Sequence, residues 1–293
     1  QNISGWERFV RSLHEKNEAV ILISGSSSNI VSEELGTKLT GRQLHCYITP
    51  LDFKEYLLFM NLSITGKQDV ILNSEVIKKH FRNYIRTGGF PEIVLLNDPE
   101  FTVKILRSYF NDILHRDIIS RFRIQEIEKI QSLLEFYLSN FSSLISFNKI
   151  AGFLNSNREL IRRYSYYINS SYLIFFIKRF SFSIKNQENN LRKVYTIDTG
   201  LSNSLGLSFS ENYGRIMENM TALKLLRLRN ADPGFNFFYW RDKHNRNETD
   251  FLIKEGLKVT HAIQVCRNFD DPETKKRELL GLKGATKELN LKR

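Results

Sequence analysis

Glu248-Thr-Asp-Phe-Leu-Ile253 is the most informative stretch of this chain. The apolar residues after its acidic start are typical of a short buried strand. The polar segment 242–247 separates it from an aromatic run at 235–241, and this pattern predicts two strands joined by a turn. Helical and strand patterns alternate around the pair, which predicts an α/β unit. The other elements expected here are a strand at 193–197, a turn at 198–200, a helix at 213–229, a strand at 261–266 and a helix at 271–289.

Acidic residues in this unit follow the pattern of a metal-dependent nuclease. Glu218 lies on the amphipathic helix, and Glu248 and Asp250 flank the start of the strand. Nucleases of the restriction-endonuclease-like class use a helical Glu, an Asp at a strand start and Glu-x-Lys on the next strand, where the carboxylates hold a divalent metal that activates water. Here Gln264 replaces the second metal carboxylate and Cys266 replaces the lysine.

Both replacements weaken the metal site. A neutral amide is a poor ligand for magnesium, and a thiol cannot do the work of an ammonium group. We therefore expect a retained fold with a degenerate site and no bound metal. Metal-dependent cleavage of DNA is the less favoured alternative.

The middle of the chain has the layout of a winged helix-turn-helix. Two helical patterns, 146–154 and 158–168, are joined by a tight turn, and an apolar strand follows at 172–177. The polar stretch 183–192 is interpreted as a linker or wing loop. The second helix carries basic side chains suited to a phosphate backbone, and the alternative is a helical hairpin whose arginines are merely solvated. These arginines are Arg158, Arg162 and Arg163.

The N-terminal part shows the pattern of an incomplete α/β domain. The continuous apolar run Ala19-Val-Ile-Leu-Ile-Ser-Gly25 predicts a strand of a parallel sheet covered on both faces. A second strand is expected at 43–48. Helices are expected at 6–13, 29–39, 51–59 and 74–88, the last ended by Gly88-Gly89, and two long helices are expected within 100–139.

Composition narrows the classes of protein. The chain has 293 residues and a net charge of +11, and its first 99 residues carry equal numbers of acidic and basic side chains, so the excess lies in the later two thirds. A basic surface favours nucleic acid as a partner, and a solvated lysine-rich surface is the alternative. Two cysteines exclude a disulfide scaffold, which favours a reducing, cytoplasmic setting. No stretch approaches the ~18–20 apolar residues of a membrane span, so no membrane partner is expected.

A phosphate-binding loop is not found in the sequence. Such a loop needs the spacing Gly-x-x-x-x-Gly-Lys-Ser/Thr, so that backbone amides wrap the phosphates. The Gly66-Lys67 pair is followed by Gln68, and Asn61 stands where the first glycine should be. The chain by itself therefore shows no apparatus for nucleotide catalysis.

Several short stretches together form one recognisable pattern. They are Gln1-Asn-Ile-Ser-Gly-Trp-Glu7, Ile23-Ser-Gly-Ser-Ser-Ser28, Leu39-Thr-Gly-Arg42, Pro50-Leu-Asp-Phe-Lys-Glu-Tyr56, Gly88-Gly-Phe-Pro-Glu92, Asp112-Ile-Leu-His-Arg-Asp-Ile118, Tyr195-Thr-Ile-Asp-Thr-Gly-Leu201 and Glu248-Thr-Asp-Phe-Leu-Ile253. In this order they resemble an archaeal and bacterial group of predicted AAA+ ATPases with a C-terminal domain of unknown function, composed of a winged helix and a PD-(D/E)XK nuclease-like domain.

The resemblance implies roles for two residues. In that family the Walker A and Walker B segments lie before the stretch that corresponds to 1–7, so the chain is expected to be a fragment that keeps the second half of the ATPase core. Ser26 is similar to a sensor residue that orients the attacking water, and Arg42 to an arginine finger given to a neighbouring subunit, or else it is a surface arginine. ATP and Mg²⁺ are implied for the full-length relative, and no cofactor is expected for this chain.

The combined expectation is an α/β mosaic of four parts. A fragment of an ATPase coupled to DNA or to a DNA-associated partner is the favoured function. A non-enzymatic DNA-binding or interaction module is the alternative, and a second copy of the chain is a candidate partner through the AAA+ core. The expected parts are a partial AAA+ core at 1–66, a helical connector at 67–140, a winged helix at 141–185 and a restriction-endonuclease-like domain at 186–293.

Overall fold

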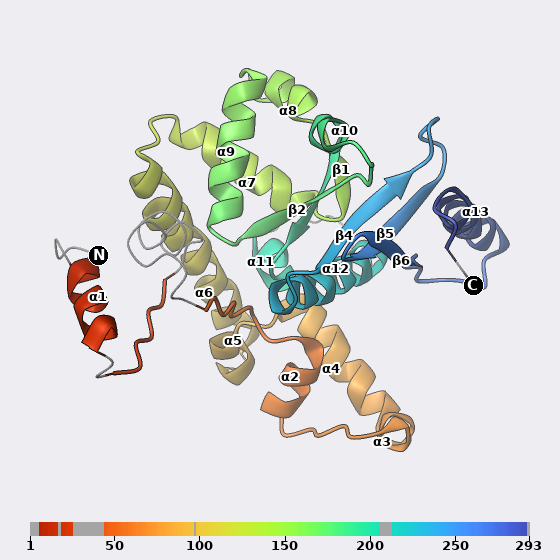
Figure 1. The fold of residues 1–293 in the computed structure, drawn as a ribbon. Coiled ribbons are helices and arrows are strands. Elements are labelled where there is room, and N and C mark those ends of the chain that lie inside the picture. Colours follow the sequence, from red (N-terminus) through yellow and green to blue (C-terminus); the bar gives the residue numbers. More distant parts are fainter. Residues whose placement is uncertain (1–5, 17–18, 26–43, 97, 206–212, 292–293) are drawn as a thin grey trace.

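Two small antiparallel sheets surrounded by helices make up the fold (Figure 1). The computed structural model describes residues 6–16, 19–25, 44–96, 98–205 and 213–291. The first sheet has the strand order β1-β3-β2, and the second has the order β4-β5-β6. The strands are β1 (Ser143–Ile145), β2 (Ile174–Lys178), β3 (Arg192–Thr196), β4 (Phe235–Arg241), β5 (Glu248–Glu255) and β6 (Lys258–Ile263).

Helices supply the greater part of the described chain. The helix patterns of the sequence from residue 51 onward are confirmed, with ends that differ by a few residues, as is the helix at the N-terminus. The helices are α1 (Trp6–Lys16), α2 (Phe53–Phe59), α3 (Lys67–Leu72), α4 (Ser74–Thr87), α5 (Pro91–Leu96), α6 (Pro99–Asp112), the π-helix η2 (Ile113–Ser120), α7 (Ile127–Ser139), α8 (Phe147–Phe153), α9 (Arg158–Ser170), α10 (Ile184–Asn189), α11 (Thr199–Ser204), α12 (Tyr213–Ala231) and α13 (Pro272–Glu288).

The two strands predicted near the N-terminus are wrong. Residues 19–25 and 44–49 have irregular backbone, and Val20, Leu22 and Leu44 are 93%, 93% and 100% exposed. A strand is stable only when neighbouring strands take up its hydrogen bonds and cover its faces, and neither segment belongs to either of the two sheets. The parallel sheet expected here is therefore not formed in the described part of the chain. The helix expected at 29–39 lies outside the described residues.

The first sheet packs against α7 and α9 to form the larger core. Leu133, Ile161 and Val194 are fully buried there, one from each of the three layers. The hydroxyl groups of Tyr137 and Ser165 form a hydrogen bond of 2.6 Å inside this core, which satisfies both buried polar groups.

A short contact joins the first sheet to the second. Arg179, just beyond β2, forms a parallel bridge with Tyr239 of β4, and the Phe180 amide donates to the Tyr239 carbonyl at 2.7 Å. Since β3 pairs with both β1 and β2, the expected boundary between residues 185 and 186 falls on the connection between two strands of one sheet. Residues 184–189, interpreted from sequence as a linker or wing loop, form α10.

Three stretches that are far apart in the sequence meet around Asp198. The residues 198–200, predicted as a turn, instead begin α11, and Asp198 is the N-cap that accepts from the Leu201 amide at 3.1 Å. The same buried carboxylate accepts from the Gly89 amide at 2.7 Å, and the Gly89 carbonyl accepts from the Leu51 amide at 2.8 Å. The segment after α4 is thus held between the start of α2 and the start of α11.

Arg227 ties α12 to the same region. Its guanidinium contacts Asp52 at 3.1 Å and Glu55 at 2.9 Å, and it donates to the Pro50 carbonyl at 2.5 Å. Asp52 and Glu55 also form the capping box of α2, so the arginine reinforces a helix start.

Replacement of Gly88 by alanine tests this packing. Gly88 has φ +82°, and a Cβ atom there would lie 2.0 Å from Asp198 Oδ1, so Gly88→Ala is expected to lower the free energy of unfolding by at least about 2 kcal/mol. Gly152→Ala is the matched control, because Gly152 lies in α8 with open space where its Cβ would be. Urea denaturation should show the control unchanged or slightly stabilised, and equal values for both variants would contradict the described contact.

Candidate functional site

A lysine surrounded by carboxylates forms the candidate site. The Lys193 Nζ atom lies 2.9 Å from Glu218 Oε1, 2.6 Å from Glu248 Oε1 and 3.0 Å from Asp250 Oδ1. The lysine side chain is only 3% exposed. The structure therefore brings together the three acids that the sequence marked as a nuclease-like remnant, around a lysine that sequence reasoning did not select. We call these four residues the lysine–carboxylate cluster.

Strand geometry explains why these side chains converge. Alternate residues of a strand point to the same face, so Lys193 and Tyr195 share one face of β3, and Glu248 and Asp250 share one face of β5. The Tyr195 hydroxyl donates to Glu218 Oε1 at 2.7 Å, and Glu218 comes from α12. The cluster thus connects the first sheet, the second sheet and the helix packed against them (Figure 1).

Gln264 serves as a hydrogen-bond partner of Asp250. Its Nε2 atom donates to Asp250 Oδ2 at 2.9 Å, and its Oε1 atom accepts from the Asp250 amide at 3.2 Å. The Val265 amide also donates to Asp250 Oδ2, at 3.0 Å, and Gln264 reaches Glu278 of α13 as well. One carboxylate oxygen of Asp250 is therefore occupied by amide donors. Cys266, a free thiol, is half-buried in the loop beyond β6.

Burial and charge set the protonation of the cluster. Burial lowers the pKa of Lys193, but the charges of Glu218, Asp250 and Glu248 outweigh it and hold that pKa above its ordinary value. Burial raises the pKa of Glu218 to about 7; the Lys193 ammonium opposes this, and the Asp250 carboxylate adds to it. The pKa of Lys193 is raised because three carboxylates stabilise its ammonium. The pKa of Glu218 is raised as well, because burial and the Asp250 carboxylate outweigh the one ammonium that the three acids share. Lys193 therefore stays charged, and Glu218 changes its protonation near neutrality.

The other predicted site residues lie elsewhere. Arg158, Arg162 and Arg163 are all exposed on α9. Ser26 and Arg42 lie outside the described residues. Within the described part of the chain, no group of three or more His, Cys, Asp or Glu side chains is arranged to hold a metal ion.

Lys193 left a signal in the sequence that could have been used. The strand expected at 193–197 is apolar apart from this residue and a threonine, and such a pattern is typical of a buried strand. The pattern therefore indicates a buried lysine. A buried ammonium needs carboxylate partners, and Glu218, Glu248 and Asp250 were the acids already expected in one unit.

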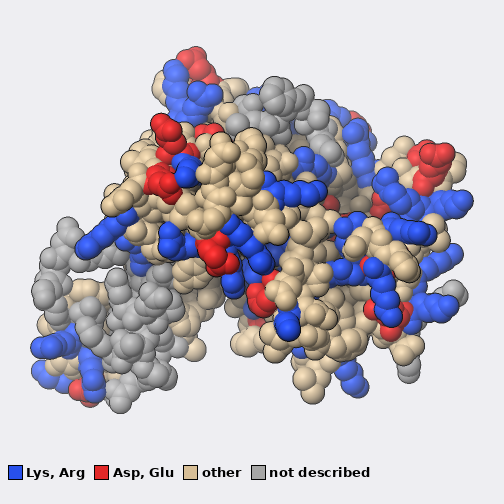
Figure 2. Space-filling model, turned by 90° about the horizontal axis from the view of Figure 1, so that it is seen from above, with Lys and Arg blue, Asp and Glu red and all other residues tan. Residues whose placement is uncertain are grey.

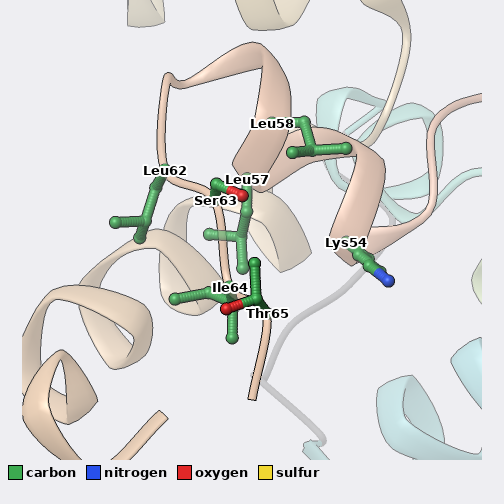
Figure 3. A pocket seen from close by; sticks show the side chains of 7 residues that line it. All are labelled: Lys54, Leu57, Leu58, Leu62, Ser63, Ile64 and Thr65. Carbon is green, nitrogen blue, oxygen red and sulfur yellow. The ribbon is translucent and has the colours of Figure 1, made fainter. Parts of the chain in front are cut away.

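A hollow beside α2 does not contain a comparable group of charged side chains. It has a volume of about 310 Å³ and is lined mainly by aliphatic side chains together with Ser63 and Thr65. Figure 3 shows Lys54 pointing away from the other lining residues. Apart from these two hydroxyls and the Lys54 amine, the lining residues carry no acid or nucleophile, so the lysine–carboxylate cluster remains the stronger candidate site.

Two segments of the chain match known protein families. Residues 1–57 match the family described as "AAA domain", and residues 78–212 match "Domain of unknown function (DUF8612)". The matches relate this chain to AAA-like ATPases. The second match covers α5 to α11 and the whole first sheet, including the strand that carries Lys193. No solved structure matches the chain significantly.

Relatives of the chain come from archaea and bacteria. The uncharacterized protein MJ1544 of Methanocaldococcus jannaschii is 38% identical over 99% of this chain and 64% of the relative. An uncharacterized protein of Haemophilus influenzae is 28% identical over 93% of this chain and 65% of its own length. The chain thus spans slightly less than two thirds of these relatives. No helix in the described residues has the length and apolar character needed to cross a membrane.

The raised pKa of Glu218 predicts a pH-dependent stability. The folded chain keeps the Glu218 proton up to about pH 7, whereas the ordinary value is 4.5, so the folded state binds more protons between these values. The free energy of unfolding therefore falls as pH rises through this window. In Glu218→Gln this contribution is absent, and the variant should gain roughly 1–3 kcal/mol relative to the parent between pH 5 and pH 8.

Urea denaturation across this pH range measures the difference. Burial also raises the pKa of Asp198, to about 6, and this contributes an equal slope to both proteins. Glu255→Gln, at an exposed position of β5, is the control and should follow the parent. A Glu218→Gln variant with the parent's pH profile would contradict the assignment.

Proposed function

We propose that this chain is the DNA-binding region of an AAA-like ATPase and that α8 and α9 contact the duplex as a winged helix-turn-helix. The observation that carries the proposal is the topology of 127–196. A helix, a strand, two helices and a strand follow one another, and the short helix α10 then leads to the last strand; the strands pair in the order β1-β3-β2, all antiparallel. This is the arrangement expected of a winged helix, in which the second helix of the pair enters a groove of DNA.

The geometry of α9 supports this role. Asn157 caps its start by accepting from the Leu160 amide at 2.8 Å, and Arg158 follows as the first helical residue. Ile161 and Ile168 are fully buried, so one side of α9 faces the core. The three arginines of α9 are exposed, where they can reach phosphates without first leaving the protein interior.

The surrounding surface is also suited to a polyanion. The face seen from above, over α8, α9 and α10, carries spread Lys and Arg side chains with smaller groups of Asp and Glu between them (Figure 2). Exposed Lys149 lies in α8, the helix packed against α9, and adds positive charge there. Lys185 of α10 is exposed as well. The net charge of +11 agrees with a nucleic-acid partner.

The ATPase part of the proposal is supported by the AAA match at residues 1–57. Within it, Ser26 would orient the attacking water and Arg42 would act on the nucleotide of a neighbouring subunit, which requires an oligomer. ATP and Mg²⁺ are the cofactors proposed for the whole protein. Hydrolysis would then be coupled to remodelling of DNA or of a partner bound to it.

Salt-dependent binding to a short DNA duplex tests the proposed surface. The triple variant Arg158→Ala, Arg162→Ala, Arg163→Ala should weaken binding at low salt by at least about tenfold and flatten the slope of log K against log salt by about 2–3. Fluorescence anisotropy of a labelled duplex gives both quantities. The circular dichroism spectrum and the thermal unfolding of the triple variant should match those of the parent, since all three positions are exposed.

A second triple variant controls for the loss of charge. Lys78→Ala, Lys79→Ala and Arg82→Ala remove as many positive charges from exposed positions of α4. This control should bind almost as tightly as the parent. Equal losses in both variants, or no binding by the parent at low salt, would contradict recognition by α9.

A further inference from the structure

The acids of the cluster do not fit a divalent metal in the arrangement that this structure shows. In nucleases of the restriction-endonuclease-like class the carboxylates converge on a metal ion. Here the space between Glu218, Glu248 and Asp250 is taken by the Lys193 ammonium, with contacts of 2.6–3.0 Å to all three. The positions of the remaining metal ligand and the lysine of that class hold Gln264 and Cys266.

We propose that the Lys193 ammonium is the resident cation of this cluster, takes the place of a divalent metal, and turns the cluster into a joint between the two sheets that does not cleave nucleic acid. This role is independent of DNA binding by α9. It also implies a latent divalent-cation site that opens when the lysine side chain is shortened.

The balance of charge in the cluster supports Lys193 as the replacement for a metal ion. Arg241 also contacts Glu248, at 3.3 Å, so two cations face three carboxyl groups. A proton held on Glu218 makes this set neutral, which agrees with the raised pKa of that carboxyl. Removal of Lys193 leaves uncompensated negative charge at a site where Glu218 is 13% and Asp250 9% exposed. Burial of such charge is costly unless a cation enters.

The cluster also has an open side. Glu248 is 27% exposed, compared with 3% for Lys193, so a cation from solvent can approach along Glu248. Hard divalent ions such as Mn²⁺ prefer carboxylate oxygen ligands. The Tyr195 hydroxyl on Glu218 provides a reporter, because a bound Tb³⁺ ion can be excited through a tyrosine that lies beside it.

Thermal unfolding in millimolar Mn²⁺ tests the proposal on the whole chain. The parent should show no saturable rise in Tm, whereas Lys193→Ala should have a lower Tm without metal and regain about 5 °C or more with Mn²⁺. The double variant Lys193→Ala, Asp250→Asn should lose most of this response. Lys178→Ala removes a half-exposed lysine of β2 that pairs with Glu188 and with no acid of the cluster, and its Mn²⁺ response should be that of the parent.

Each other outcome has a clear meaning. A saturable Mn²⁺ response of the parent that Asp250→Asn abolishes would overturn the proposal, as would nicking of plasmid DNA by the parent with Mn²⁺ that Asp250→Ala abolishes. A folded Lys193→Ala variant without Mn²⁺ response or Tb³⁺ luminescence would also overturn it. If Lys193→Ala is unfolded in the absence of metal, refolding by Mn²⁺ supports the proposal and failure to refold contradicts it.

Discussion

A buried ammonium group is the constraint on which the C-terminal half of this fold depends. Lys193 is 3% exposed, and a charge in such a place is tolerated only with close partners of opposite sign. Its partners come from α12 and β5, so β3 cannot take another position relative to them without leaving the charge unpaired. Apolar packing alone is less selective, because it accepts many arrangements of similar volume.

A second set of polar contacts organises the other half around Asp198. This carboxylate binds the amide of Gly89 and caps α11, while Arg227 of α12 holds the start of α2. The stretches 50–56, 88–92 and 195–201, which carried the resemblance to AAA+ ATPases, are therefore contact partners in one place. Their joint occurrence in a sequence has a structural cause that does not depend on catalysis.

Local patterns predicted the longer helices, because a helix satisfies its own backbone hydrogen bonds and shows its buried face in its spacing. The short helices α10 and α11 were instead interpreted as a linker or wing loop and as a turn. The apolar segment 19–23 was misread as a strand, since a strand depends on neighbours that its own sequence does not reveal. The acids of the cluster were predicted from their positions relative to the helix and strand. Lys193 was missed because it comes from the other sheet, and pairing between Lys193 and Asp250 is a tertiary fact.

Burial separates the two kinds of positive charge in this chain. The Lys193 ammonium is enclosed by carboxylates, so it contributes to the fold and is not available to a polyanion. The arginines of α9 are exposed, so their charge remains available to phosphates at small desolvation cost. Net charge alone could not distinguish these cases, since both kinds contribute equally to +11. Glu218, Glu248 and Asp250 thus pair with a buried ammonium, whereas the arginines of α9 are positive charges that a polyanion in solvent can reach.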